Sequence, residues 1–162
     1  MSNGRVKVGF IGAGTISYLH ELGYHDNETG ELYAIADPAP GLAQSRKEAW
    51  GAQKAYTDYK ELLADPTVDA VEILLPHHLH LPITLEALSA GKHVSLQKPM
   101  AISMDEGHQI AAAAAASDKV FRVVENYRTY EPYMRAKAMI EAGEISDLVS
   151  IRVMMVRGKG QG

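Results

Sequence analysis

The chain has 162 residues, enough for one domain of ordinary size and part of a second. Apolar residues make up 46% and charged residues 22%, a mixture typical of globular proteins, and the net charge of −4 gives no general attraction to nucleic acid or to an anionic membrane. The sequence has no cysteine, which excludes disulfides, thiolate nucleophiles and cysteine-based zinc sites, and its longest apolar run, 110–116, is too short for a membrane span, so we expect a soluble cytoplasmic protein.

The first part of the chain alternates short apolar runs with helical patterns. Strands are predicted at 6–11, 32–36 and 69–75, and helices at 15–24, 40–50 and 56–64. Gly51 is placed to end the second helix, and either Thr57 or Asp58 to cap the third. The run at 69–75 is nearly continuous in apolar residues, as expected for a strand that is buried on both faces.

The same alternation continues to residue 126. A helix at about 78–90 ends at Gly91, a strand covers 93–96, Ser103–Glu106 forms a capping box before an alanine-rich helix, and a further strand covers 120–125. Strands that alternate with helices through short connections predict parallel βαβ units. We therefore predict an α/β fold with a doubly wound parallel sheet.

The pattern changes after residue 126. A helix is predicted at 129–142, with Thr129 as its cap and Gly143 as its end. Residues 148–156 alternate and predict a half-buried strand of the antiparallel kind, with an apolar face that we expect to lie uncovered. The apolar positions of this alternation are Val149, Ile151, Val153 and Met155. We accordingly assign 1–126 to the first domain and 127–162 to the first helix and strand of a second, α+β domain.

The first predicted strand leads into Gly12-Ala13-Gly14-Thr15-Ile16-Ser17, a glycine-rich turn. In a dinucleotide site Gly12 permits the tight turn, and Gly14 lets the backbone approach a pyrophosphate, toward which the following helix directs free N–H groups. A side chain at Gly12 is then expected to abolish dinucleotide binding and to leave the fold intact. Glycine turns after strands are also common without a ligand, so a purely structural turn is the alternative.

Asp37 lies at the end of the second predicted strand, close to the expected spacing of about 20 residues at which a carboxylate accepts the adenosine ribose hydroxyls. The alternative is a cap of the turn before Pro38, and the two roles are compatible. A carboxylate here would repel the 2′-phosphate of NADP, and no arginine follows before Arg46, so NAD is favoured over NADP. The sequence has no P-loop lysine pattern, which argues against nucleotide hydrolysis.

Two further strand ends carry polar residues, at Leu75-Pro76-His77-His78-Leu79-His80 and at Gln97-Lys98-Pro99. Ligands of open α/β sheets bind outside the carboxyl ends of the strands, where these residues fall. The three histidines lack an accompanying acidic ligand pattern, so we predict no metal site and consider capping of the next helix the better explanation. Lys98 lies between a buried strand and a proline that fixes its backbone, as an oriented ammonium requires; the alternative is an ordinary solvated lysine.

These motifs, together with Ala-Gly-Lys-His-Val-Ser-Leu-Gln-Lys-Pro at 90–99, resemble the family of glucose–fructose oxidoreductase, inositol dehydrogenase and rhizopine-catabolism proteins. Asn126-Tyr127-Arg128 and Ala142-Gly143-Glu144-Ile145 fit the family as well, so the resemblance covers essentially the whole chain. It implies an NAD(P)-binding Rossmann domain followed by a second domain that carries substrate contacts. It also implies a homo-oligomer that assembles through that second domain.

The resemblance implies a role for each motif. Pyrophosphate contacts are expected from Gly12, Gly14, Thr15 and Ile16, a ribose contact from Asp37, and further cofactor contacts from Leu75, Pro76, His77, His80, Gln97, Lys98 and Asn126. Lys98 would also be the catalytic residue, beside the substrate hydroxyl. Two positions depart from the family, because Gln97 stands where glutamate is usual and His77 where asparagine is common.

The activity that the resemblance implies is hydride transfer between a nicotinamide cofactor and a secondary alcohol of a sugar, a polyol or a related small molecule. The aspartate and histidine that complete proton transfer in the family are expected beyond Gly162. Two alternatives stay open, an NAD-dependent glycosidase and a non-catalytic dinucleotide sensor, and the Gln97 departure favours both slightly.

Overall fold

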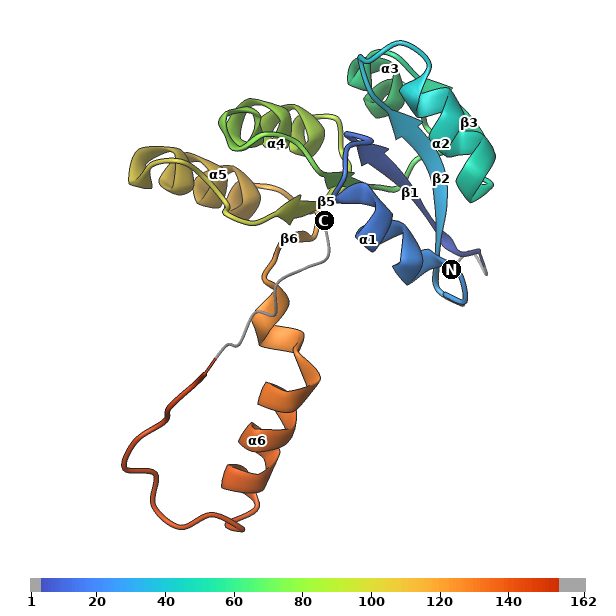
Figure 1. Cartoon of the computed structure of the whole chain (residues 1–162). Helices are drawn as coiled ribbons and strands as arrows, with labels where there is room; N and C mark the ends of the chain where they lie inside the picture. The colour runs from blue at the N-terminus through green and yellow to red at the C-terminus, as the bar shows by residue number, and fades with distance from the viewer. Residues whose placement is uncertain (1–3, 155–162) are drawn as a thin grey trace. The chain divides into compact units, whose positions relative to one another are not determined.

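The computed structural model describes residues 4–154 and separates into two compact units, Met1–Val124 and Glu125–Gly162 (Figure 1). The first unit contains a six-stranded sheet in the order β3-β2-β1-β4-β5-β6, in which every neighbouring pair is parallel. The strand order reverses between β1 and β4, which defines the topological switch point of a doubly wound fold. The predicted α/β class is therefore confirmed.

The strands of the first unit are β1 (Val6–Ile11), β2 (Gly30–Ala36), β3 (Lys54–Tyr56), β4 (Ala70–Ile73), β5 (His93–Gln97) and β6 (Phe121–Val124). Its helices are α1 (Ser17–Glu21), α2 (Leu42–Trp50), α3 (Tyr59–Ala64), α4 (His80–Ser89) and α5 (Met104–Ala116), with short 3-10 turns η1 (Leu22–Tyr24) and η2 (His77–Leu79). None of the helices in residues 4–154 is long and apolar enough to cross a membrane.

Local sequence signals set several helix ends. Gly51 and Gly91 follow α2 and α4 in the left-handed region, at φ +72° and +73°, where a residue without a Cβ is favoured. The Asp58 carboxylate accepts the Lys60 N–H at the start of α3, which resolves the choice between Thr57 and Asp58 as the cap. Ser103 caps α5 by accepting the Glu106 N–H, as the predicted capping box requires.

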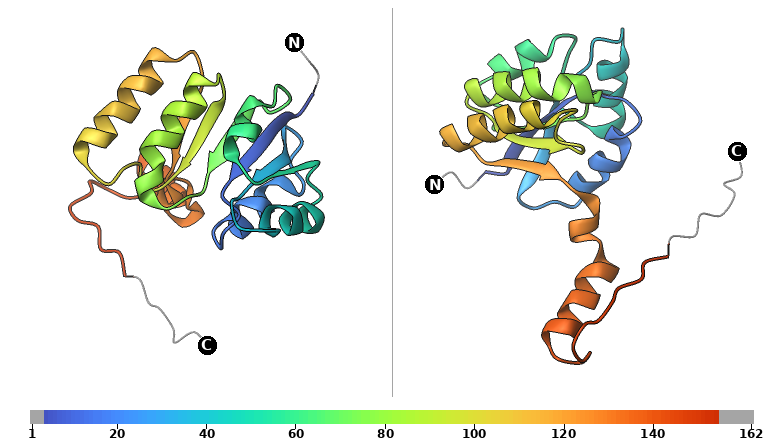
Figure 2. Two further views of the ribbon diagram at one scale, coloured as in Figure 1. Left: turned by 90° about the horizontal axis from the view of Figure 1, so that it is seen from above. Right: turned by 90° about the vertical axis from the view of Figure 1, so that its left-hand side faces the viewer.

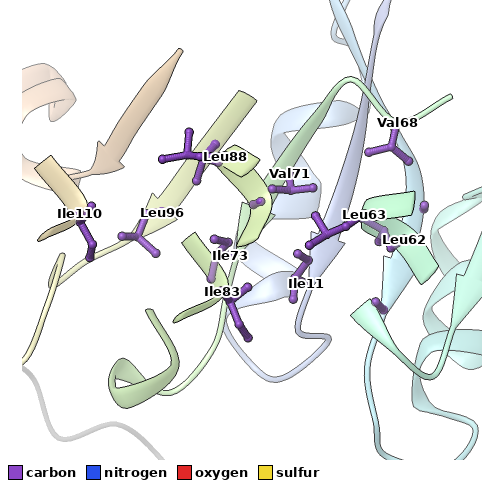
Figure 3. Close-up of a cluster of buried hydrophobic side chains, with 14 residues drawn as sticks. Ile11, Leu62, Leu63, Val68, Val71, Ile73, Ile83, Leu88, Leu96 and Ile110 are labelled. Atoms are coloured by element: carbon purple, nitrogen blue, oxygen red, sulfur yellow. The ribbon is translucent and has the colours of Figure 1, made fainter. Parts of the chain in front are cut away.

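The sheet buries an apolar layer on each face. On one face, α3, α4 and α5 cover a core built around Leu62, Ile73, Leu96 and Ile110, all of which are fully buried (Figure 3). Helices α4 and α5 lie side by side over this face (Figures 1 and 2). A second buried cluster, which includes Phe10, Ile35, Ala43 and Leu74, packs with side chains from η1 and α2. Burial on both faces explains why the strands are so apolar.

A buried polar cluster holds the turn that precedes β4. Lys92 donates to the carbonyl oxygens of Asp65 and Val68, both at 2.7 Å, and burial lowers the pKa of Lys92. The Asp65 carboxylate accepts from the Lys54 ammonium at 2.8 Å and from the Tyr56 hydroxyl at 2.9 Å. This cluster lies at the amino-terminal end of the strands, whereas ligands of such sheets bind at the carboxyl ends, so its role is structural.

Strand β3 was absent from the sequence prediction, which placed residue 56 at the start of a helix. The strand has three residues, all half-buried, and pairs with β2 at the edge of the sheet. A three-residue segment cannot display a period of two convincingly, so neither its length nor its burial pattern distinguishes it from a loop.

The second unit contains the 3-10 turn η3 (Asn126–Thr129) and helix α6 (Glu131–Glu141), which is followed by Gly143 at φ +73°. The predicted strand at 148–156 is wrong for the residues described, because 148–154 form no strand and positions 155 and 156 lie outside the described range. Val149, Ile151 and Val153 are exposed, as expected of an uncovered apolar segment. A strand needs a partner for its backbone N–H and C=O groups, and the alternation of side chains alone does not supply one.

Candidate dinucleotide and substrate site

Gly12 is required by the turn itself. It adopts φ +103°, and a Cβ at this position would lie 2.5 Å from the carbonyl oxygen of Leu74. The expectation that a side chain at Gly12 leaves the fold intact is therefore wrong, since the clash is with backbone that cannot move freely. Gly12 places the end of β1 tightly against the end of β4.

Gly14 has the opposite surroundings. A Cβ at Gly14 would meet no protein atom within 4 Å, so packing does not explain a glycine here. The backbone N–H groups of Gly14, Thr15 and Ile16 have no hydrogen-bond acceptor among residues 4–154. Open space in front of unpaired N–H groups fits a pyrophosphate, whose oxygens are strong acceptors. Ser17, the small residue in the third position of the motif, is fully buried and its hydroxyl donates to the Gly14 carbonyl oxygen at 2.6 Å.

Both carboxylate oxygens of Asp37 accept backbone N–H groups. One oxygen accepts from Ala13 in the glycine turn and the other from Ala39, each at 2.8 Å. The turn-capping alternative is therefore present, and it also orients the carboxylate. Each oxygen has further lone pairs, so two ribose hydroxyls remain compatible with these contacts.

A cavity of about 450 Å³ opens beside Asp37. Its walls come from the carboxyl ends of β1, β2, β3 and β4 and from the segments that follow them, and include Pro38, Tyr59, Leu75 and Leu79. The lining also includes Asp58, whose carboxylate caps α3, so a largely apolar cavity of this size with Asp37 at its edge fits the adenosine part of a dinucleotide. Leu75 lines this cavity, and its contact with the cofactor stays a prediction.

Arg46 of α2 also reaches the turn. Its guanidinium lies 4.1 Å from the centre of the Tyr18 ring and 5.3 Å from that of Trp50, and its Nε approaches the Ala13 carbonyl oxygen at 3.4 Å. These cation–π contacts and the hydrogen bond hold the guanidinium against the protein.

His80 has no polar atom left for a cofactor. It is fully buried, with Nδ1 2.8 Å from the Pro99 carbonyl oxygen and Nε2 3.0 Å from the Leu75 carbonyl oxygen. We therefore correct its predicted role from cofactor contact to a link between the loops that follow β4 and β5. Pro76 and His77 are exposed at the start of that first loop, so both stay candidates for cofactor contact.

The capping explanation for the histidines is also wrong, because neither η2 nor α4 begins with a side-chain cap. Among residues 4–154, no group of three or more acidic or histidine side chains is arranged to hold a metal ion. His77 and His78 are exposed, and the two ring nitrogens of His80 face carbonyl oxygens.

Lys98 directly follows β5 and its side chain is exposed. Its ammonium makes no hydrogen bond or ion pair with any residue in the range 4–154, so a ligand would not have to displace a protein partner. Asn126 lies in the second unit, which is described by itself, and its cofactor contact stays a prediction.

Gln97, in contrast, is buried and both polar atoms of its side chain have protein partners. Its Oε1 accepts the Lys98 backbone N–H, and its Nε2 lies 2.7 Å from Nε2 of His20, a residue of α1. We therefore correct Gln97 from a cofactor contact to a residue that holds the Lys98 backbone.

The sequence interpretation missed His20 and Glu72. Glu72 interrupts the apolar run of β4, and a carboxylate in a strand that is buried on both faces needs partners, which was an available signal. The Glu72 carboxylate lies 2.5 Å from His20 Nδ1 and accepts a hydrogen bond from the Tyr24 hydroxyl at 2.7 Å. Burial, the charge of Glu72 and the hydrogen bond together raise the pKa of Tyr24 well above its usual range.

The strand order, the open glycine turn and the carboxylate-edged cavity at the carboxyl ends of the strands define a dinucleotide-binding Rossmann domain. Residues 6–125 match the oxidoreductase family with an NAD-binding Rossmann fold that is named after glucose–fructose oxidoreductase, inositol dehydrogenase and the rhizopine-catabolism protein MocA. The chain belongs to this family.

Three relatives illustrate the similarity. Levoglucosan dehydrogenase of Pseudarthrobacter phenanthrenivorans is 31% identical over 155 residues, which cover 91% of this chain and 40% of the relative. The structure of Lactobacillus casei scyllo-inositol dehydrogenase with NAD(H) and scyllo-inositol is 25% identical, with a TM-score of 0.82, over 89% of this chain and 43% of that one. A 3-ketoreductase from Actinomadura kijaniata in complex with TDP-benzene and NADP is also 25% identical, with a TM-score of 0.80, over 90% and 46%. The chain thus spans less than half the length of each.

Proposed function

We propose that the protein that carries this chain is a nicotinamide-dependent oxidoreductase that acts on a secondary alcohol of a sugar, a polyol or a related small molecule. The observation that carries this proposal is the set of groups at one edge of the sheet: an open glycine turn, Asp37 beside a cavity, and the unpaired ammonium of Lys98. The first two suit a dinucleotide, and the third suits the oxygen of a substrate alcohol.

Each group of the site would have its own role in binding or in stabilising charge. The nicotinamide, when bound, supplies the hydride chemistry, and the protein supplies orientation and electrostatics. The N–H groups of the glycine turn would hold the pyrophosphate, and Asp37 the ribose. The Lys98 ammonium would donate a hydrogen bond to the substrate oxygen and stabilise its alkoxide character as the hydride leaves the carbon.

NAD is the cofactor that we propose. The Asp37 carboxylate is fixed by two backbone N–H groups, so it would remain close to a 2′-phosphate and repel it. The structures of relatives contain NAD(H) in one case and NADP in another, so the family as a whole does not decide between them. The comparison of NAD and NADP affinities for this chain tests the point directly.

A sugar or polyol substrate is supported by the names of the relatives, which include levoglucosan and scyllo-inositol, both rich in hydroxyl groups. The test is incubation of the protein with a panel of sugars and polyols and NAD, while the absorbance of the reduced cofactor is followed. Net reduction of NAD supports a dehydrogenase. Release of sugar without net reduction would identify a glycosidase, and binding without reaction would identify a sensor.

A further inference from the structure

A chain of partly buried hydrogen bonds leads from β4 to the backbone of Lys98. It runs from the Glu72 carboxylate through the His20 imidazole to the Gln97 side chain, and from Gln97 Oε1 to the Lys98 N–H at 2.7 Å. The side chains of His20 and Glu72 are 12% and 13% exposed, so water offers little competition for these bonds. The Tyr24 hydroxyl donates to the remaining oxygen of Glu72.

The direction of every bond in this chain can be assigned from the backbone N–H of Lys98. An N–H can only donate, so the Gln97 atom that faces it is the carbonyl oxygen, and the amide nitrogen therefore faces His20. That nitrogen also donates, so His20 Nε2 accepts and carries no proton. The proton of a neutral His20 is consequently on Nδ1, from which it is donated to Glu72.

We propose that His20 and Glu72 are positioning residues that fix the Gln97 amide and thereby the backbone from which Lys98 extends. The functional part of this inference, that Lys98 serves a substrate alcohol, rests on the proposed function above. The carboxylate of Glu72 selects the His20 tautomer, the tautomer selects the orientation of the amide, and the amide oxygen holds Lys98.

The same logic predicts what a charge at position 97 would do. In Gln97→Glu, both ring nitrogens of His20 face carboxylates, so the imidazole is expected to hold two protons and carry a positive charge. In the double variant Gln97→Glu with Glu72→Gln, a single carboxylate faces Nε2. The proton of a neutral His20 is then expected on Nε2, the reverse of the wild-type tautomer.

Nitrogen NMR of the labelled chain tests the three states without cofactor, because the ¹⁵N shifts of an imidazole distinguish its two tautomers and its charged form. The expected series at neutral pH is Nδ1–H in the wild type, a doubly protonated ring in Gln97→Glu and Nε2–H in the double variant. A wild-type His20 that is charged, or protonated on Nε2, would overturn the proposal. So would a double variant that retains the wild-type tautomer.

Hydrogen exchange at the Lys98 amide tests the positioning role. In His20→Ala we expect that amide to exchange at least about tenfold faster, because the orientation of Gln97 is no longer fixed. The matched control is His25→Ala, since His25 pairs with Glu21 and has no bond to Gln97. Equal exchange at Lys98 in the two variants would overturn the positioning role, and the tautomer series still decides the matter if His20→Ala fails to fold.

A titration with NAD separates this inference from the proposed function. The expected tautomers with no affinity for NAD would refute the proposed function and leave the hydrogen-bond chain intact. Normal NAD affinity with the wrong tautomers would refute only the chain. In the protein that carries this chain, we expect His20→Ala to lower kcat at least about tenfold and to change the Kd for NAD less than about twofold.

Discussion

The carboxylate of Asp37 accepts the backbone N–H of Ala13 at 2.8 Å, so the residue expected to bind the ribose also closes the glycine turn. The two halves of the proposed dinucleotide site are therefore joined through one hydrogen bond. A substitution of Asp37 removes a charge near the ribose and at the same time releases the Ala13 N–H. Cofactor preference and turn geometry cannot be altered independently at this position.

The double substitution of Asp37→Ser with Pro38→Arg tests cofactor preference. We expect the ratio of NADP to NAD affinity to rise by at least about tenfold, because a repulsive carboxylate is replaced by a cation. The lost bonds to Ala13 and Ala39 should also lower the free energy of unfolding by about 1–3 kcal/mol. Titration calorimetry with both cofactors measures the first effect and urea unfolding the second. A parent chain that already binds NADP more tightly than NAD would contradict our interpretation of Asp37.

The glycine turn is best tested at Gly14. Gly14→Val should weaken NAD binding at least about a hundredfold, because the side chain occupies the space in front of the free N–H groups, and should change stability by less than about 0.5 kcal/mol. Gly23→Val is the matched control, since a Cβ at Gly23 would also meet no protein atom within 4 Å, and Gly23 lies outside the turn. Equal NAD affinities for the two variants would remove the pyrophosphate site from this turn.

The substitution Lys98→Ala tests the proposed contact between Lys98 and the substrate oxygen. Since the ammonium has no partner within residues 4–154, we expect the fold and the Kd for NAD to be unchanged, while turnover by the protein that carries this chain falls at least about a hundredfold. Lys60→Ala, at an exposed lysine of α3, is the control. Near-normal turnover of Lys98→Ala would reduce Lys98 to a solvated lysine.

The low pKa of Asp65 leads us to expect that the protein loses stability in acid. Burial acts to raise the pKa of Asp65, but hydrogen bonds from Lys54, the Thr67 N–H and Tyr56 outweigh it and hold the pKa well below its usual range. A depressed folded-state pKa stabilises the fold fully above the unfolded-state value of about 3.9, and this contribution is lost as the pH falls through the folded-state pKa.

We therefore expect Asp65→Asn to lower the free energy of unfolding by about 1–3 kcal/mol at pH 7, and the difference from the wild type to shrink below about pH 4. Urea unfolding at a series of pH values measures it. Asp118→Asn is the control, because the Asp118 side chain is 83% exposed and pairs with the neighbouring Lys119. A difference that stays constant down to pH 2 would show that the charge of Asp65 is not responsible.

The features that the sequence predicted well are local. Asp58, Ser103 and Gly51 cap or end helices through contacts within four residues, so the pattern and the structure depend on the same atoms. The glycine turn and Asp37 were also recognisable, because a fixed spacing places them at neighbouring strand ends. The predicted strand at 148–156 was wrong for residues 148–154, since a strand depends on a partner that no local pattern contains.

In the candidate site, too, local features were predictable from the sequence and contacts with distant residues were not. The exposed ammonium of Lys98 follows from its position between a buried strand and a proline, whereas the partners of Gln97 come from α1 and β4, far away in the sequence. His80 looked like a ligand because it stands in a cluster of histidines. Only the three-dimensional structure reveals the carbonyl oxygens of Leu75 and Pro99 on either side of its ring.

The bridge that His80 makes has a consequence for redesign of this domain. The loop after β4 contributes Leu75 and Leu79 to the cavity beside Asp37, and the loop after β5 carries Lys98. Because one imidazole lies within hydrogen-bond distance of both loops, a graft that replaces the first loop to accommodate another cofactor would also shift the support of the second. The two loops should therefore be exchanged as a single cassette, with the histidine retained, if a new cofactor preference is to be combined with the existing chemistry.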